Sequence, residues 1–239
     1  MPREKPDALW RAIHDSLNAD IAAARYAPGD KLPTEAVLAA RFGVNRHTVR
    51  RALGELAGAG VIFTRRGAGA FVAHRPTDYP IGTRVRFHQN LRAAGRLPAK
   101  EILALETRAA DAAEAEALRL APGAQVHVYD GLSLADGMPV ATFRSSFPAA
   151  RFPDLPLGLM RLKSVTEALR EQGVADYIRA STRLTAKLAS PTQALHLHLS
   201  PGAPILRTTA VNVDPDGLPI EYGRTWFAGD RITLTLSGP

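Results

Sequence analysis

The chain has 239 residues, enough for one large domain or two modest ones, and its content of 46% hydrophobic and 22% charged residues is typical of a soluble globular protein. It has no cysteine, which excludes disulfides and thiolate metal sites and fits a reducing compartment. No apolar run is long enough to span a membrane, and Asp7, Asp15 and Asp20 fall where a signal peptide would be apolar. We therefore expect a cytoplasmic protein.

The positive charge is concentrated near the N-terminus. Residues 1–75 hold 12 lysines and arginines against 7 acidic residues, a net charge of +5, whereas the rest of the chain holds 18 against 16. This asymmetry fits a polyanionic partner, although binding to a membrane surface would use charge in the same way.

Two helices are expected before residue 43. Apolar residues recur at spacings of three and four over residues 7–24, which predicts an amphipathic first helix (Trp10, Ile13, Leu17 and Ile21). After a turn rich in proline and glycine, Thr34 is positioned to cap a short second helix.

A third helix is predicted to begin after Asn45, which suits an N-cap position. At 100° per residue, four aliphatic side chains form one stripe that must pack inward (Val49, Ala52, Leu53 and Leu56). Three basic side chains point away from that stripe (His47, Arg50 and Arg51), and Arg46 lies on the flank between them. A short helix of this kind suits insertion into the DNA major groove.

Taken alone, the basic face would be interpreted as an ordinary solvated surface. The preceding helix and the turn at Gly43 supply the first half of a helix-turn-helix. Two strands are expected next, with Arg65 and Arg66 beside a small turn that contains Gly67 and Gly69 and can approach a DNA backbone closely. Together these features indicate a winged helix-turn-helix.

The segments GDKLPTE, FGVNRHTVRRAL and RRGAGAFV resemble the DNA-binding domain of the GntR family of bacterial transcription regulators, over residues 10–72. The resemblance implies DNA contacts from the start of the third helix and from the wing. With the two wing arginines and the second wing glycine added from the residue argument, the expected DNA-binding residues are Asn45, Arg46, His47, Thr48, Arg50, Arg65, Arg66, Gly67 and Gly69. Ala36 occupies a position that is often an arginine in that family, so one contact differs here.

A polar, proline-bearing segment over residues 76–82 is interpreted as a linker between a domain of residues 1–75 and a domain of residues 83–239. The second part contains an internal repeat, because LAPGAQV recurs as LSPGAPI and the segment DGMP recurs as DGLP. Each copy indicates helix, turn, strand, hairpin and strand. Two such units predict an α+β fold in which an antiparallel sheet has helices on one face.

The patterns LxPGAPI, DGxP and PIEY…GDR resemble the UTRA domain of the HutC branch of the GntR family, which has a chorismate lyase-like fold. The resemblance implies that residues 83–239 bind a small effector and dimerise. The stretch from Tyr79 to Leu91 is similar to regulators of phosphonate metabolism of the PhnF type, which implies a phosphonate or phosphate ester as the effector.

Carried over by position, the resemblance implies effector contacts from Arg86, Ser133, Ser164, Thr166 and Glu221. Ser164 also opens a helix in capping-box form, so simple helix capping is its alternative role. For Glu221 the alternative is a surface carboxylate.

Arg183 lies in an alternating strand and is added as an effector-binding candidate, with a solvated surface role as its alternative. Two arginines of typical sugar-phosphate sensors correspond to Gly131 and Ser133 here, which favours a smaller or differently held anion.

We therefore expect a homodimeric repressor that binds a pseudo-palindromic double-stranded DNA operator and responds to a small phosphorus-containing anion. No catalytic residue, cofactor or metal site is expected, and His196 and His198 lack a third ligand nearby. The alternatives are a regulator with another effector, such as an amino-sugar phosphate or a histidine-pathway acid, and an enzyme related to chorismate lyase.

Overall fold

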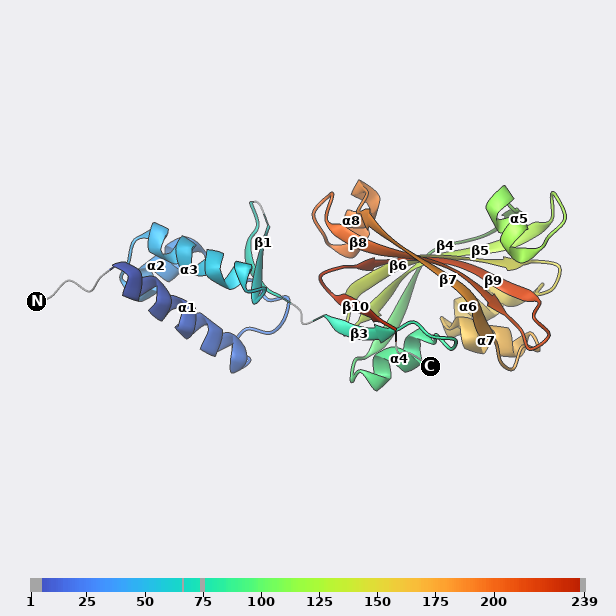
Figure 1. The fold of residues 1–239 in the computed structure, drawn as a ribbon, viewed down its shortest axis with the longest axis horizontal. Helices are drawn as coiled ribbons and strands as arrows, with labels where there is room; N and C mark the ends of the chain where they lie inside the picture. Colours follow the sequence, from blue (N-terminus) through green and yellow to red (C-terminus); the bar gives the residue numbers. More distant parts are fainter. Residues whose placement is uncertain (1–5, 66, 74–75, 237–239) are drawn as a thin grey trace, which may run out of the picture. The chain divides into compact units, whose positions relative to one another are not determined.

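The computed structural model describes residues 6–65, 67–73 and 76–236 (Figure 1). The chain divides into two compact units, residues 1–75 and residues 76–239. Over the described ranges, no helix is both long enough and apolar enough to cross a membrane.

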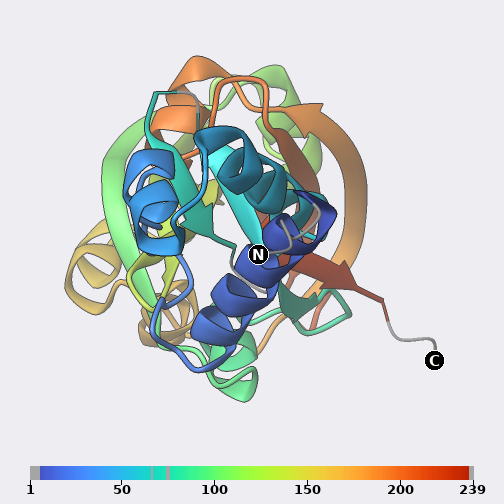
Figure 2. The ribbon, with the colours of Figure 1, turned by 90° about the vertical axis from the view of Figure 1, so that its left-hand side faces the viewer.

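The first unit packs three helices against a two-stranded hairpin, and its helices are the blue elements of Figure 2. Its elements are α1 (Pro6–Ala22), α2 (Glu35–Phe42), α3 (Arg46–Gly58), β1 (Ile62–Arg65) and β2 (Gly69–Val72). The predicted stripe of α3 is buried in one core with residues of α1 and α2. The hydroxyl of Thr34 caps α2, and Gly43 ends it in the left-handed conformation at φ 64°. The winged helix-turn-helix prediction is therefore confirmed.

A buried carboxylate joins α1 to α2. Asp20 is 5% exposed and accepts from Arg25 Nη1 at 2.8 Å and from Arg41 Nη2 at 2.9 Å. Because the acceptor is buried and both donors are charged, these hydrogen bonds are of the stronger, charge-assisted kind. They hold the two helices in the arrangement that presents α3.

The second unit is built on a six-stranded antiparallel sheet with the order β4-β5-β6-β9-β8-β7. Its strands are β4 (Pro98–Ala109), β5 (Gln125–Ala135), β6 (Met138–Pro148), β7 (Ile178–Leu188), β8 (Pro204–Val213) and β9 (Pro219–Ala228). The predicted repeat is present: α5 (Ala112–Leu118) precedes the β5–β6 hairpin, and α8 (Pro191–Leu197) precedes the β8–β9 hairpin. Strands β6 and β9 pair at the centre and join the two copies.

Helices cover both faces of this sheet, so the expectation of one covered face is wrong (Figure 1). Helix α5 packs on Val126 and Val128 of β5, whereas α6 (Leu155–Leu162) and α7 (Val165–Glu171) pack on Tyr129 of the same strand. Consecutive strand residues point to opposite faces, which puts the two groups of helices on opposite sides. The reason is that nearly every position of β5 and β6 is buried, without the alternation of a one-sided sheet.

The interpretation of residues 76–82 as a linker is wrong for most of that segment. Residues Thr77–Pro80 form strand β3, which pairs in parallel with β10 (Ile232–Thr235). Tyr79 and Ile81 are buried with residues of the main sheet and of α4 (Phe87–Ala93). The alternating side chains of β3 are buried and exposed in turn, so its pairing with a distant strand converts a polar stretch into part of the second unit.

Candidate functional site

The first half of α3 presents a basic surface above its buried stripe. Arg46, His47 and Arg50 are exposed. Asn45 caps the helix, since its Oδ1 accepts from the backbone N of Thr48 at 2.9 Å and from the Thr48 hydroxyl at 3.0 Å. This cap fixes the start of the helix, where a recognition helix meets base edges.

Arg50 is held by a carboxylate of α2. Its Nε donates to Glu35 Oε1 at 3.0 Å and its Nη2 donates to Glu35 Oε2 at 2.7 Å. The hydrogen bonds lower the pKa of Glu35 and raise that of Arg50. Because the bidentate pair pre-orients the guanidinium, a DNA contact from Arg50 requires it to share or exchange Glu35.

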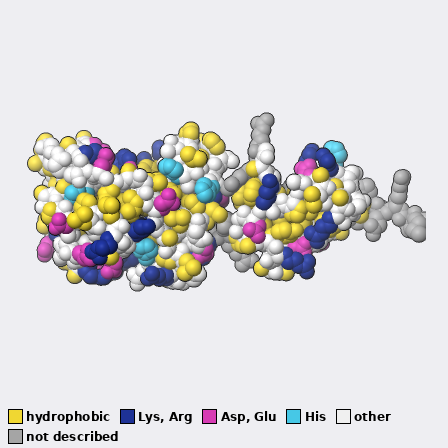
Figure 3. Space-filling model, turned by 180° about the vertical axis from the view of Figure 1, so that it is seen from behind, with side chains coloured by type: hydrophobic (Ala, Val, Ile, Leu, Met, Phe, Trp, Pro, Cys, Tyr) yellow, Lys and Arg dark blue, Asp and Glu magenta, His cyan; other side chains and the backbone are white. Residues whose placement is uncertain are grey.

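The hairpin turn depends on glycine. Gly67 has φ 76° and Gly69 has φ 111°, conformations that side chains rarely adopt. A Cβ on Gly69 would lie 3.1 Å from Lys31 Cε, so the turn packs closely on Lys31. Arg66 and the side chain of Arg65 lie outside the described residues, so their expected contacts remain predictions. Figure 3 shows arginine and lysine side chains in dark blue on the visible face of this unit, interspersed with hydrophobic ones.

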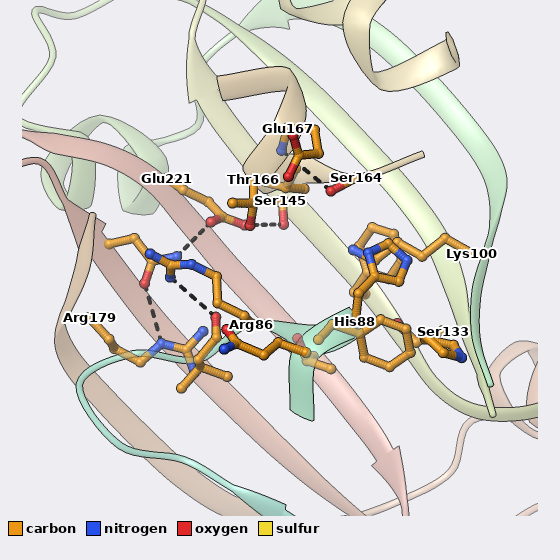
Figure 4. Close-up of a pocket in the computed structure, with 18 of the residues that line it drawn as sticks. Arg86, His88, Lys100, Ser133, Ser145, Ser164, Thr166, Glu167, Arg179 and Glu221 are labelled. Atoms are coloured by element: carbon orange, nitrogen blue, oxygen red, sulfur yellow. Dashed lines mark hydrogen bonds between the residues drawn. The ribbon is translucent and has the colours of Figure 1, made fainter. Parts of the chain in front are cut away.

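The second unit contains a cavity of about 970 Å³ on the face of the sheet that α4, α6 and α7 cover. This is the upper end of the size range of small-molecule sites. Ser133, Glu221 and other strand residues form its floor, and residues of α4 and α7 line its sides. In Figure 4, Lys100, His88 and Ser133 lie on one side of the cavity, and Glu221 and Arg179 lie on the other.

The cavity contains five of the six predicted effector residues. The structure brings together Arg86, Ser133, Ser164, Thr166 and Glu221 along its lining. Ser164 also caps α7, because its hydroxyl accepts from the backbone N of Glu167 at 3.4 Å. The full capping box is not formed, since the Glu167 side chain pairs with Arg170.

Arg183 does not line the cavity, so the structure does not bring it together with the other five candidates. Strand β7 has a bulge between Arg179 and Ser181, and Arg183 pairs with Thr209, whereas Arg179 pairs with Asn212, a cavity residue. Directly paired residues point to the same face, and the extra residue of the bulge reverses the alternation. Arg179 therefore faces the cavity, and Arg183 is exposed on the other face.

Arg86 is already engaged within its own unit. Its guanidinium lies 3.5 Å from the centre of the Tyr177 ring. Its Nη2 donates to the Tyr177 carbonyl at 2.6 Å and to Asp176 at 3.2 Å. Much of its hydrogen-bonding capacity is therefore used before any ligand binds.

Lys100 is a cavity residue that the sequence argument missed. It is paired with Ser133 across β4 and β5, and its Nζ lies 4.2 Å from the centre of the Phe143 ring. Burial lowers the pKa of Lys100 to about 8, despite the opposing attraction of Glu221. Nothing in the local sequence indicates that Lys100 faces inward, because a bulge between Ile102 and Ala104 interrupts the alternation of β4.

Glu221 is a buried carboxylate, 8% exposed, that is held by neutral groups. The Ser145 hydroxyl donates to its Oε1 at 2.6 Å, and the Asn212 Nδ2 donates to its Oε2 at 2.6 Å. These bonds aim the carboxylate at the cavity, so the alternative of a surface residue is excluded.

A helix-turn-helix unit followed by a unit with a polar cavity indicates a DNA-binding transcription regulator. The gntR family of bacterial regulatory proteins matches residues 9–72, and the UTRA domain matches residues 93–233. The chain thus belongs to the GntR family and carries the UTRA domain of its HutC branch.

This chain is similar to transcription regulators over most or all of its length. A helix-turn-helix transcriptional regulator of Rhizobium meliloti is 39% identical over 98% of this chain and 96% of that protein. The probable transcriptional regulator PhnF of Escherichia coli is 35% identical, over 88% of each chain. The crystal structure of PhnF from Mycobacterium smegmatis aligns with a TM-score of 0.63 at 27% identity, over 95% of this chain and 99% of that one. These likenesses confirm a regulator of the PhnF type rather than an enzyme.

Proposed function

We propose that this regulator is a homodimeric repressor, acting in the cytoplasm, whose two first units read the half-sites of a pseudo-palindromic operator. The observation that carries the DNA assignment is the exposed start of α3 with its basic side chains above a buried stripe. A two-fold protein dimer matches a two-fold operator, and a repressor occupies a site that the transcription machinery also needs.

The proposed effector is a small phosphorus-containing anion bound in the cavity of the second unit. Its support is the likeness to PhnF proteins together with the partly buried ammonium of Lys100 and the hydroxyls of Ser133, Ser164 and Thr166 along the cavity. Charged and hydroxyl donors are the groups that bind the oxygens of a phosphonate or phosphate ester.

One cavity residue lies on the strand that begins the second unit. Tyr79 lines the cavity and belongs to β3, the first strand after residue 76. We infer that β3 has two states and that the ligand, through Tyr79, binds one of them more tightly. The ligand then shifts β3 toward that state and changes the operator affinity by at most the ratio of its own two affinities.

Footprinting on operator DNA tests the DNA assignment. Arg46→Ala and Arg50→Ala each remove a charged group from the exposed start of α3, so we expect loss of the selective footprint. Arg183→Ala, an exposed arginine of the second unit, serves as the control and keeps it. Wild-type selectivity in both α3 variants would show that α3 is not the recognition helix.

Thermal-shift measurements test the effector class. Ethylphosphonate, inorganic phosphate, a sugar phosphate and urocanate are compared on the full chain, and the proposal expects stabilisation by a phosphorus compound. Stabilisation by urocanate alone would contradict the phosphonate assignment. A result in which no phosphorus compound stabilises the chain would contradict it as well. The volume of about 970 Å³ leaves space for a sugar phosphate, so a preference for that compound would favour the other effector.

A further inference from the structure

Two opposite charges line the same cavity, and neither forms an ion pair with a described residue. The ammonium of Lys100 has no hydrogen bond within the ranges that the structure describes and faces aromatic rings instead. Glu221 accepts only from a hydroxyl and an amide there. Glu221 is buried and Lys100 is partly buried, so each charge is costly without a partner.

The ammonium of Lys100 is placed among three rings. Its Nζ lies 4.2 Å from the centre of the Phe143 ring, 5.6 Å from that of Phe87 and 5.8 Å from that of Tyr129. Rings attract a cation through their faces but do not satisfy its three N–H donors as an anion does. The N–H donors of the ammonium are therefore available to an anionic group that enters the cavity.

The carboxylate of Glu221 is prepared for a cation. Ser145 and Asn212 occupy one position on each of its oxygens and fix its orientation. A carboxylate accepts about four hydrogen bonds, so acceptor positions remain for a ligand. Because its present donors are neutral, a ligand ammonium would supply the missing countercharge.

Three of the arginines that line the cavity do not pair with Glu221. Arg86 is bonded to Asp176 and to the Tyr177 carbonyl, and Arg170 is paired with Glu167 at 2.6 Å. Arg179 is linked to Glu221 only through Asn212, whose Oδ1 accepts from its Nε at 3.3 Å. Arg179 therefore reduces the cost of the Glu221 charge without pairing with it.

The two charges are separated within the cavity. Figure 4 shows Lys100 and Glu221 on opposite sides of the space that the lining residues enclose. The attraction of Glu221 partly opposes the lowering of the Lys100 pKa by burial, but no ion pair joins the two groups. The cavity thus has a positive pole and a negative pole with space for a ligand between them.

We propose that the effector is bipolar, with an anionic head that pairs with Lys100 and an amino group, a short chain away, that pairs with Glu221. This inference rests on the proposed function, in which the cavity is the effector site, and it specifies the ligand class within it. An aminoalkylphosphonate satisfies both poles, whereas a simple alkylphosphonate leaves Glu221 unpaired.

Calorimetric titration of the full chain compares ethylphosphonate with 2-aminoethylphosphonate, which differ by the ammonium alone. A charge-assisted hydrogen bond in a desolvated site predicts that wild type binds the amino compound about ten-fold or more tightly. Glu221→Gln keeps a side chain of the same shape and should abolish that preference. Lys100→Met should weaken both compounds.

Two exposed residues provide matched controls. Lys187→Met and Glu116→Gln remove the same charges from the surface of the second unit and should leave both affinities unchanged. The comparison of the two ligands on wild type needs no variant, so it stays decisive if a cavity variant fails to fold.

Equal affinity of wild type for the two phosphonates would overturn the bipolar ligand and leave the phosphorus effector intact. If neither phosphonate binds, taurine and β-alanine are compared with ethanesulfonate and propionate. If wild type prefers the amino compounds and Glu221→Gln removes that preference, the bipolar ligand is supported and only the phosphorus-containing head is excluded. Absence of binding by every amino compound overturns the inference, whereas footprinting separately tests operator recognition.

Discussion

The way each cationic side chain is held decides which of them remains available to a ligand. Arg50 and Arg86 are oriented by carboxylates of their own unit, Glu35 and Asp176 respectively. Lys100 has aromatic rings around its ammonium instead, so its charge is only partly compensated. At the residue scale, the anion-binding capacity of the cavity depends most on Lys100.

Effector affinity should therefore depend on pH. Lys100 has a pKa of about 8 in the folded chain, below its ordinary value of 10.5, and a bound anion favours the protonated form. Binding then takes up a proton above pH 8, and affinity should fall by at most about ten-fold per pH unit as the pH rises further. Calorimetry from pH 7 to 9.5 in buffers of different ionisation enthalpy measures both effects.

Neither His88 nor Tyr129, two titratable groups near Lys100, changes charge in this range. Burial lowers the pKa of His88 on α4 and raises that of Tyr129 on β5 to about 12. Lys100→Met shows the titration of the ligand alone and should lose the proton uptake; an unchanged profile in this variant would exclude Lys100. The same depressed pKa means that charged Lys100 opposes folding at pH 7, and that this cost disappears between pH 8 and 10.5.

Gly131 permits the close approach of strands around Lys100. A Cβ there would lie 2.5 Å from the Glu101 carbonyl oxygen and 2.6 Å from Phe143 Cζ. Gly131→Ala should therefore lower the free energy of unfolding by about 1–3 kcal/mol and weaken effector binding through displacement of Phe143. Urea unfolding measures the first effect, and Gly82→Ala, where a Cβ meets nothing within 4 Å, should be nearly neutral.

Bulges in the sheet select the side chains of the cavity at the scale of elements. The bulge in β7 turns Arg179 inward and Arg183 outward. The bulge in β4 lies between Ile102 and Ala104, after Lys100. Each inserts one residue, so the alternation changes phase along the strand. The two edge strands of the sheet thus contribute one cavity cation each.

The joint between α1 and α2 is expected to support DNA binding indirectly. Asp20→Asn removes the charge that holds Arg25 and Arg41 and should destabilise the first unit by about 1–2 kcal/mol, because both arginines remain partly solvated. Faster hydrogen exchange in α1 and α2 would show this. Asp15→Asn, at an exposed carboxylate, is the control, and equal exchange in both variants would contradict the assignment.

At the scale of the whole chain, β3 is the element that belongs to the effector unit and directly follows the DNA-binding unit. It is held by β10 and by the ring of Tyr79, whose centre lies 5.4 Å from that of Phe227. Since Tyr79 also lines the cavity, we expect ligand binding and operator binding to be coupled through this strand.

Tyr79→Leu should separate binding from response. The leucine keeps β3 apolar at this position but lacks the ring that contacts both the core and the cavity. The affinity for the effector should therefore change less than the effect of the effector on operator affinity. Operator titrations with and without ethylphosphonate measure the coupling. Tyr222→Leu, which packs with α5 on the opposite face, should retain the response; loss of response in that variant as well would indicate general loosening.

The sequence by itself determined the features that depend on neighbouring residues. The stripe and cap of α3, the glycine turn of the hairpin and the two repeated helix-strand-strand units all follow from periodicity and from residues within a few positions of one another. The tertiary structure decided which strand side chains share the cavity, because bulges set the facing of Lys100, Arg179 and Arg183. It also decided that residues 77–80 form a strand, because their partner lies about 150 residues later and strand pairing over that distance has no local signal.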